Sequence, residues 1–161
     1  MKKTLSATDR LIQDFYDNND TDNFYRKISG GDYVHIGIFK DKDEDLTVAK
    51  KRTVEYMASL LNLKKEDRIL DLGAGYGGAS RYLAETFDCK IECLNISKKQ
   101  NAQNVEWNRQ SKLDRLINVA EGSFENIPFD DSSFNIVWSQ DAIFHSTVSY
   151  THLTLPTKRI V

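Results

Sequence analysis

The apolar positions of this chain follow two spacings, and each spacing predicts one kind of element. Between residues 47 and 62 they recur every three or four positions, as on one face of an amphipathic helix, at Val54, Met57, Ala58 and Leu61. Short apolar runs have instead the length of buried strands, and they lie at residues 68–72, 90–94, 116–119 and 134–139.

Helical patterns lie between the first three of these runs. One pattern follows the run at 68–72. Another begins at Ser97, where Gln100 three positions later completes a capping-box pattern. Because strands that alternate with helices at this spacing build a parallel sheet with right-handed crossovers, the sequence predicts an α/β fold with a doubly wound parallel sheet.

The chain divides into three segments. Residues 1–46 mix aromatic with polar side chains, and we expect a helical N-terminal lid close to the substrate. Residues 47–147 carry the alternating pattern and are expected to form a ligand-binding domain with an incomplete sheet of about four strands. Residues 148–161 fit neither pattern, and their back-translation resembles a sequencing-library adapter. We interpret them as a non-native tail, with a terminal strand as the alternative.

Composition narrows the class of protein. The 22 basic and 24 acidic residues are interspersed, so no cationic surface for a nucleic-acid partner is expected. No apolar run approaches membrane-spanning length and no signal peptide is recognisable, which favours a cytoplasmic location without membrane contact. We interpret Cys89 and Cys93, which share one apolar run, as buried reduced thiols, and no metal site is expected.

A glycine-rich turn follows the first predicted strand, with Gly73, Gly75 and Gly78 in the spacing G-x-G-x-x-G. Such glycines let a ligand lie against bare main chain, and the spacing also fits dinucleotide sites. Asp71 precedes the turn, where a carboxylate can approach an ammonium group. The next strand ends at Asn95 rather than at the acid that is typical of NAD sites. These features favour S-adenosylmethionine; NAD and a purely structural turn are the alternatives.

Four stretches along the chain resemble successive motifs of class I S-adenosylmethionine-dependent methyltransferases: DLGAGYGG, CLNIS, GSFENIPFDDSSF and WSQDAIFHS. The preceding stretch, YDNNDTDNFYRKISGGDYVHIGIF, is similar to the lead-in of sarcosine/dimethylglycine N-methyltransferases, which make glycine betaine. The resemblance covers residues 10–146. It implies a Rossmann-like fold and methyl transfer from S-adenosylmethionine to the nitrogen of a small amine.

The resemblance also implies a cofactor site, made of Asp71, Gly73, Ala74, Gly75, Asn95, Ile96, Gln100, Ser123, Phe124, Gln140, Val34 and His35. The glycines would follow the methionine part of the cofactor. Asn95 stands where many relatives have a ribose-binding acid, and an amide can still bind a ribose hydroxyl. Ser123 and Phe124 occupy the adenine position, where relatives often have Asp. A helix-capping role for Gln100 and a structural role for His35 are the alternatives.

The catalytic residues implied by the resemblance are Asp141, His145 and Tyr16. In phosphoethanolamine methyltransferases, which have the same layout, the matching Asp and His act on the substrate. If residues 141–145 are helical, Asp141 and His145 share one face and the carboxylate can hold the imidazole; a capping Asp and a half-buried His are the alternative. Aromatic side chains of the lead-in are candidates for holding a cationic amine: Tyr16, Phe24, Tyr25 and Tyr33. For Phe24 we favour packing of the lid.

Two other functions remain open. One is methylation of phosphoethanolamine or another small acceptor, for which the sequence shows no cluster of cationic residues. The other is a fragment that binds cofactor at most, because the complete sheet of the family needs further strands after position 147. We therefore expect the 161-residue chain alone to be poorly soluble and inactive, because its fourth strand would be an unpaired apolar edge that invites aggregation.

Overall fold

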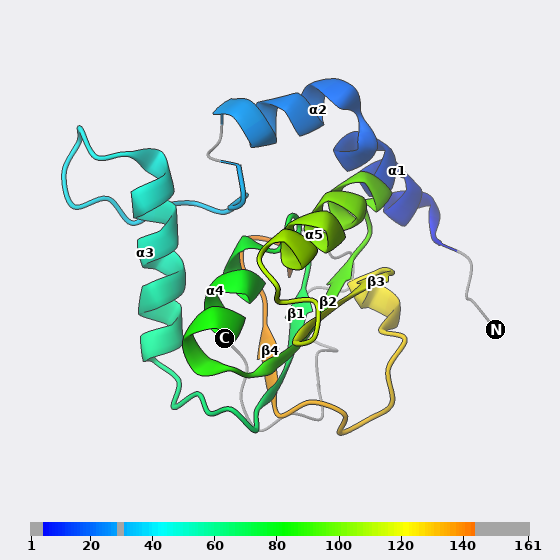
Figure 1. Ribbon diagram of the computed structural model, residues 1–161. Helices are drawn as coiled ribbons and strands as arrows, with labels where there is room; N and C mark the ends of the chain where they lie inside the picture. The colour runs from blue at the N-terminus through cyan, green and yellow to red at the C-terminus, as the bar shows by residue number, and fades with distance from the viewer. Residues whose placement is uncertain (1–4, 29–30, 144–161) are drawn as a thin grey trace.

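The computed structural model describes residues 5–28 and 31–143, and its centre is a four-stranded parallel sheet (Figure 1). The strands are β1 (Arg68–Leu72), β2 (Lys90–Asn95), β3 (Ile117–Glu121) and β4 (Ile136–Trp138). Their order is β3-β2-β1-β4, and every neighbouring pair is parallel. The chain thus steps outward from β1 and then returns to its other side, so the predicted doubly wound arrangement is confirmed.

This strand order creates a switch point between β1 and β4, where the direction of winding reverses. Asp71 of β1 lies level with Cys93 on one side and Trp138 on the other. All strands end at the same edge of the sheet, and ligands of open α/β sheets bind outside that edge at such a point. Each predicted apolar run coincides with a strand. β3 is displaced by one or two residues from the run at 116–119, and β4 is shorter than the run at 134–139.

The predicted helices are present: α3 (Leu46–Ser59) precedes β1, α4 (Gly78–Phe87) follows β1, and α5 (Lys98–Gln110) follows β2. The N-cap of α5 is Ser97, whose side chain accepts the Gln100 N–H at 3.1 Å. A capping box also needs the Gln100 side chain to accept from the Ser97 N–H, and this part of the prediction is wrong. The Gln100 side chain is drawn to Asn95 instead, whose Nδ2 donates to Gln100 Oε1 at 3.1 Å.

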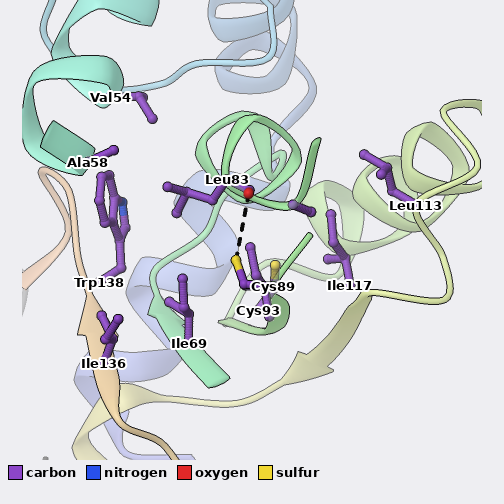
Figure 2. Close-up of a cluster of buried hydrophobic side chains, with 12 residues drawn as sticks. Val54, Ala58, Ile69, Leu83, Cys89, Cys93, Leu113, Ile117, Ile136 and Trp138 are labelled. Atoms are coloured by element: carbon purple, nitrogen blue, oxygen red, sulfur yellow. Dashed lines mark hydrogen bonds between the residues drawn. The ribbon is translucent and has the colours of Figure 1, made fainter. Parts of the chain in front are cut away.

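Apolar side chains cover both faces of the sheet. On the face beneath α3 and α4, Figure 2 shows Trp138 and Ile69 packed with Leu83 of α4 and Val54 of α3. A smaller cluster on the opposite face consists of Leu70, Leu72, Leu94 and Val137. Burial on both faces explains the unbroken buried runs of β1 and β4, at residues 69–72 and 136–138. Both cysteines are buried free thiols, as predicted.

The first part of the N-terminal segment is helical, as expected, with α1 (Ala7–Asp17), α2 (Asn19–Asn23) and the π-helical turn η1 (Phe24–Ile28), whereas residues 31–45 form turns and irregular structure. In Figure 1 these helices lie together at one end of the molecule, with α1 beside α5. A Ser6–Asp9 capping box starts α1. Within the described ranges, no helix has the length and apolar character needed to cross a membrane.

Side-chain hydrogen bonds attach α1 and α2 to the sheet domain. Asp17 accepts a hydrogen bond from the Ser97 hydroxyl at 2.6 Å and another from the Lys99 N–H at 3.1 Å, at the first turn of α5. In α2, Asp22 accepts from the buried Tyr76 hydroxyl at 2.6 Å. The Tyr76 ring in turn lies 5.7 Å from that of Trp107. Polar links of this kind therefore help to fix the position of the N-terminal helices.

Candidate cofactor-binding site

A cavity opens at the carboxyl edge of the sheet, beneath α1. It holds about 670 Å³ of space, part of which is continuous with solvent. Residues from α1, the 34–35 segment, the glycine turn and the ends of β2, β3 and β4 meet around it. Its lining consists of Asp9, Ile12, Tyr16, Val34, His35, Gly73, Gly75, Asn95, Ile96, Gln100, Ser123, Phe124, Glu125, Gln140, Asp141 and Ala142.

The structure thus brings most of the predicted cofactor residues together. Asp71 and Ala74 do not line this cavity. They line an adjoining space of about 330 Å³, whose wall also includes Gly73, Gly75 and His35. Because the two spaces share the glycine turn, a single extended ligand can contact both. Parallel strands place their carboxyl ends at one edge, which is why residues distant in sequence converge here.

The glycine turn depends on backbone conformations that other residues avoid. Gly73 has a φ of +77°, and its N–H donates to the Leu94 carbonyl at 2.8 Å, which ties the turn to β2. A Cβ at Gly73 would lie 2.3 Å from the Cβ of Ala142. The turn therefore needs glycine both for its conformation and for the close approach of the segment after β4.

Asp71 is buried beside this turn, and the Ser80 hydroxyl donates to its Oδ2 at 2.6 Å. Burial raises the pKa of the Asp71 carboxyl to about 6, against the opposing effect of the Ser80 hydrogen bond. The Cys93 thiol in turn lies 3.1 Å from the Ser80 oxygen. A cationic ligand group nearby would favour the ionised form of this carboxyl, which burial disfavours.

At the end of β2, the amide of Asn95 is fixed by its neighbours. Its Nδ2 donates to Gln100 Oε1 at 3.1 Å and to Asn101 Oδ1 at 3.2 Å. Both amide hydrogens are therefore used, and the group that Asn95 can still offer a ligand is its acceptor oxygen. Ile96 continues the wall with an apolar surface.

Beyond β3, the cavity wall joins α1 to Ser123 and Phe124. The Ser123 hydroxyl donates to Asp9 Oδ1 at 2.6 Å, and both residues are buried. Sequence reasoning missed Asp9 and Ile12. The Ser6-x-x-Asp9 capping pattern marks the start of α1 and would have identified the helix, and steps of three and four residues from Asp9 then reach Ile12 and Tyr16.

His35 lines both spaces and carries a buried ring nitrogen without a hydrogen-bond partner among the described residues. Its Nδ1 lies 3.0 Å from the Ile36 carbonyl oxygen, which only accepts, so Nδ1 carries the proton. Burial lowers the pKa of His35, which favours the neutral ring with an unprotonated Nε2. Among the described residues, neither this Nε2 nor the buried side-chain amide atoms of Gln140 have a hydrogen-bond partner. Buried polar atoms normally find partners, so the wall fits a polar ligand such as S-adenosylmethionine.

The predicted catalytic residues meet different outcomes. Asp141 has a φ of +50° and stands in a bend, so the expected helix does not include it. Its Oδ2 instead accepts the Ile36 N–H at 2.7 Å, and this bond holds the carboxylate at the cavity. Tyr16 lines the cavity, and burial raises the pKa of its hydroxyl to about 12. His145 lies outside the described residues, so its pairing with Asp141 stays a prediction.

The aromatic lead-in is only partly at the cavity. The ring of Tyr25 lies 6.0 Å from that of Tyr16, whereas Phe24 is half exposed and contacts Tyr25 edge-on. Tyr33 lines the smaller space, where its ring meets His35 at 5.4 Å. In the described part of the chain, no three or more His, Cys, Asp or Glu side chains lie together in a way that could hold a metal ion.

Comparisons with known proteins agree with this geometry. The sequence model of the family described as mycolic acid cyclopropane synthetase matches residues 3–152. The glycine/sarcosine/dimethylglycine N-methyltransferase of Actinopolyspora halophila is 48% identical over 83% of this chain, which covers 24% of that protein. The sarcosine/dimethylglycine N-methyltransferase of Halorhodospira halochloris is 44% identical over 82% of this chain and 48% of its own length.

A solved structure extends the likeness to three dimensions. A Galdieria sulphuraria protein assigned as a sarcosine dimethylglycine methyltransferase superposes with a TM-score of 0.74 and 43% identity, over 80% of this chain and 50% of that one. The chain thus spans half or less of these relatives. The predicted resemblance to sarcosine/dimethylglycine N-methyltransferases is confirmed. Because the family match covers nearly the whole chain, this chain belongs to the mycolic acid cyclopropane synthetase family of class I S-adenosylmethionine-dependent methyltransferases.

Proposed function

We propose that the protein containing this chain transfers a methyl group from S-adenosylmethionine to the nitrogen of sarcosine or dimethylglycine. The observation that carries the proposal is the single cavity in which the glycine turn, the Asn95 amide and the Ser123–Phe124 segment converge beside Asp141 and Tyr16. The 48% and 44% identical relatives support this choice of amine. Residues 1–46 would act as the lid and residues 47–147 as the cofactor domain.

The lining of the two spaces supports one orientation of the cofactor. Its methionine end would lie against Gly73 and Gly75, where Asp71 and the bare Nε2 of His35 can accept from an ammonium group. The acceptor oxygen of Asn95 suits a ribose hydroxyl. When bound, the cofactor supplies an electrophilic methyl group on its sulfonium sulfur. The protein's own task is then to align the amine, exclude water and manage the proton of the amine.

The amine must lose its proton before it can attack, and the cavity offers two groups near which this can happen. Tyr16, with its pKa raised to about 12, stays protonated at neutral pH and therefore serves as a hydrogen-bond donor. Asp141 is the carboxylate that can accept from the amine N–H, and its hydrogen bond from Ile36 N–H holds it in place. We assign the acceptor role to Asp141 and the orienting role to Tyr16, and His145 remains the predicted partner of Asp141.

Charge at the cavity disfavours phosphoethanolamine as the acceptor. The residues found to line the cavity in the described part of the chain include no Lys or Arg. A phosphate monoester carries close to two negative charges and is usually gripped by such side chains. We also propose a cytoplasmic location, which the two free buried thiols of Cys89 and Cys93 support.

The test combines binding and turnover on the complete gene product. Calorimetric titration should give heat with S-adenosylhomocysteine and none with NAD. Transfer of a labelled methyl group should occur to sarcosine or dimethylglycine and not to phosphoethanolamine, and Asp141→Asn should slow it by at least 100-fold, as for loss of an acid–base group. Heat with NAD alone would refute the cofactor, and turnover of phosphoethanolamine alone would refute the amine.

A further inference from the structure

Asp9 is a buried carboxylate that lines the cavity beside Ser123. It belongs to the first turn of α1 and is 7% exposed. The Ser123 hydroxyl donates to its Oδ1 at 2.6 Å, although Ser123 lies 114 positions away in the sequence. The Ser6 N–H donates to its Oδ2 at 3.0 Å. Helix α1 thus adds a carboxylate acceptor to a wall that also includes the glycine turn and the strand ends.

The Asp9 carboxylate can accept further hydrogen bonds besides these two. An ionised carboxylate offers about four lone-pair sites, and one bond on each oxygen leaves acceptor capacity on both. Asp9 lines the cavity, so a bound ligand can reach it. Ile96 and Phe124 line the same cavity with apolar surfaces, which suit the faces of a planar ring. The end of the cavity near Asp9 therefore fits an aromatic base that carries an N–H donor on its edge.

We propose that Asp9 accepts a hydrogen bond from the exocyclic 6-amino group of the cofactor's purine, so that α1 determines the specificity for adenine. The inference rests on the proposed function, because that function orients the nucleoside with its base beyond Asn95. Asp9 is here a specificity-determining residue rather than a catalytic one. Binding of the base and docking of α1 then favour each other.

A purely structural role makes a different prediction. Asp9 also belongs to the capping box of α1, and a cap affects every ligand that needs α1 in place, whichever base the ligand carries. Ser6→Ala removes the side chain that caps the Asp9 N–H and leaves the Asp9 carboxylate present. Ser6→Ala is therefore the matched control for Asp9→Ala, because both variants weaken the cap and only one removes the acceptor.

The experiment compares two probes by calorimetry: S-adenosylhomocysteine and its analogue without the 6-amino group. The unmodified protein should prefer the adenosyl probe by about 10- to 100-fold, the usual effect of a hydrogen bond to a charged group. Asp9→Ala should reduce this preference to less than about threefold, whereas Ser6→Ala should keep it even if both affinities fall.

Each other outcome is decisive. Equal affinity of the unmodified protein for the two probes would overturn the inference without any variant, and so without concern about folding. A loss in Asp9→Ala that is the same for both probes would show that Asp9 acts only through α1. Failure of the unmodified protein to bind either probe would instead refute the proposed function on which the inference rests.

Discussion

The sheet domain and the N-terminal helices are held in place by different forces. In the sheet domain, side chains such as Leu83, Ile69 and Trp138 are removed from water within one apolar cluster. On α1, by contrast, Leu11 is 72% exposed and Phe15 is 54% exposed. What fixes α1 and α2 is polar: Asp17 at the start of α5, Asp22 on Tyr76, and Asp9 on Ser123.

This difference predicts which part of the molecule should detach first. Burial of apolar area makes a large, non-directional contribution to the free energy of folding. A single hydrogen bond, by contrast, contributes on the order of 1 kcal/mol net. The N-terminal helices should therefore detach at a lower free energy than the sheet unfolds. The cavity lies between the two regions, so detachment of the N-terminal helices should widen its opening to solvent.

The largest expected effect is in the apolar cluster. Leu83→Ala should lower the free energy of unfolding by about 2–5 kcal/mol, because it leaves a cavity under α4. Leu11→Ala removes the same atoms from an exposed site of α1 and should change stability by less than about 0.5 kcal/mol. Chemical denaturation measures both. Comparable losses in the two variants would show that α1 also depends on apolar burial.

Asp71 should make the stability of the ligand-free protein fall as pH rises. Its folded pKa, about 6, lies above the ordinary 3.8, so the folded state binds the proton more tightly. Protonated Asp71 contributes its full stabilisation of the folded state below about pH 4. This contribution decreases as the pH rises to about 6, and the total loss is about 3 kcal/mol. Denaturation of Asp71→Asn across this range should lack that component. A pH dependence identical to that of the unmodified protein would show that Asp71 is ionised throughout.

Gly73→Ala should damage binding at the boundary between the two regions. The new Cβ meets Ala142 at 2.3 Å and the backbone φ is +77°, so we expect a cost of about 1–3 kcal/mol and a loss of affinity for S-adenosylhomocysteine of about 10- to 100-fold. Gly31→Ala shares the positive φ but meets only one atom, at 3.7 Å. Calorimetry should find normal affinity in that control. An equal loss of affinity in both variants would show that backbone strain alone, and not the contact with Ala142, causes the effect.

The smallest effect should be local to α1. Asp17→Asn weakens the hydrogen bonds to Ser97 and Lys99, so amide hydrogen exchange in α1 should accelerate by about fivefold, or about 1 kcal/mol, while exchange in β1 and β2 stays unchanged. Asp14→Asn makes the same change of charge at an exposed position of α1 and should leave exchange unaltered. Faster exchange in the strands as well would mean that the two regions unfold together.

The same contrast explains what could be predicted from sequence. The strands and the helices that follow them were predictable because burial leaves a periodic signature, as in the run that became β1. Gly73, Asn95 and Ser123 were predicted together from the resemblance, and they line one cavity because parallel strands end at the same edge of the sheet. Their roles in binding and catalysis stay predictions.

The contacts of α1 were not predictable, because no local pattern encodes a bond between Asp9 and Ser123 across 114 positions. The left-handed bend at Asp141 was missed for a related reason. No glycine marks it, and its carboxylate is held by the main chain of Ile36, 105 positions away.

The contact between Tyr76 and Trp107 gives the protein a natural optical probe. Asp22 of α2 holds the Tyr76 hydroxyl, and the Arg81 guanidinium lies 5.3 Å from the Trp107 ring. An indole with these polar and charged neighbours changes its fluorescence when one of them moves. Detachment of α2 should therefore be visible in the emission of Trp107 without any attached dye, and Trp107→Phe would identify its share of the signal against that of Trp138.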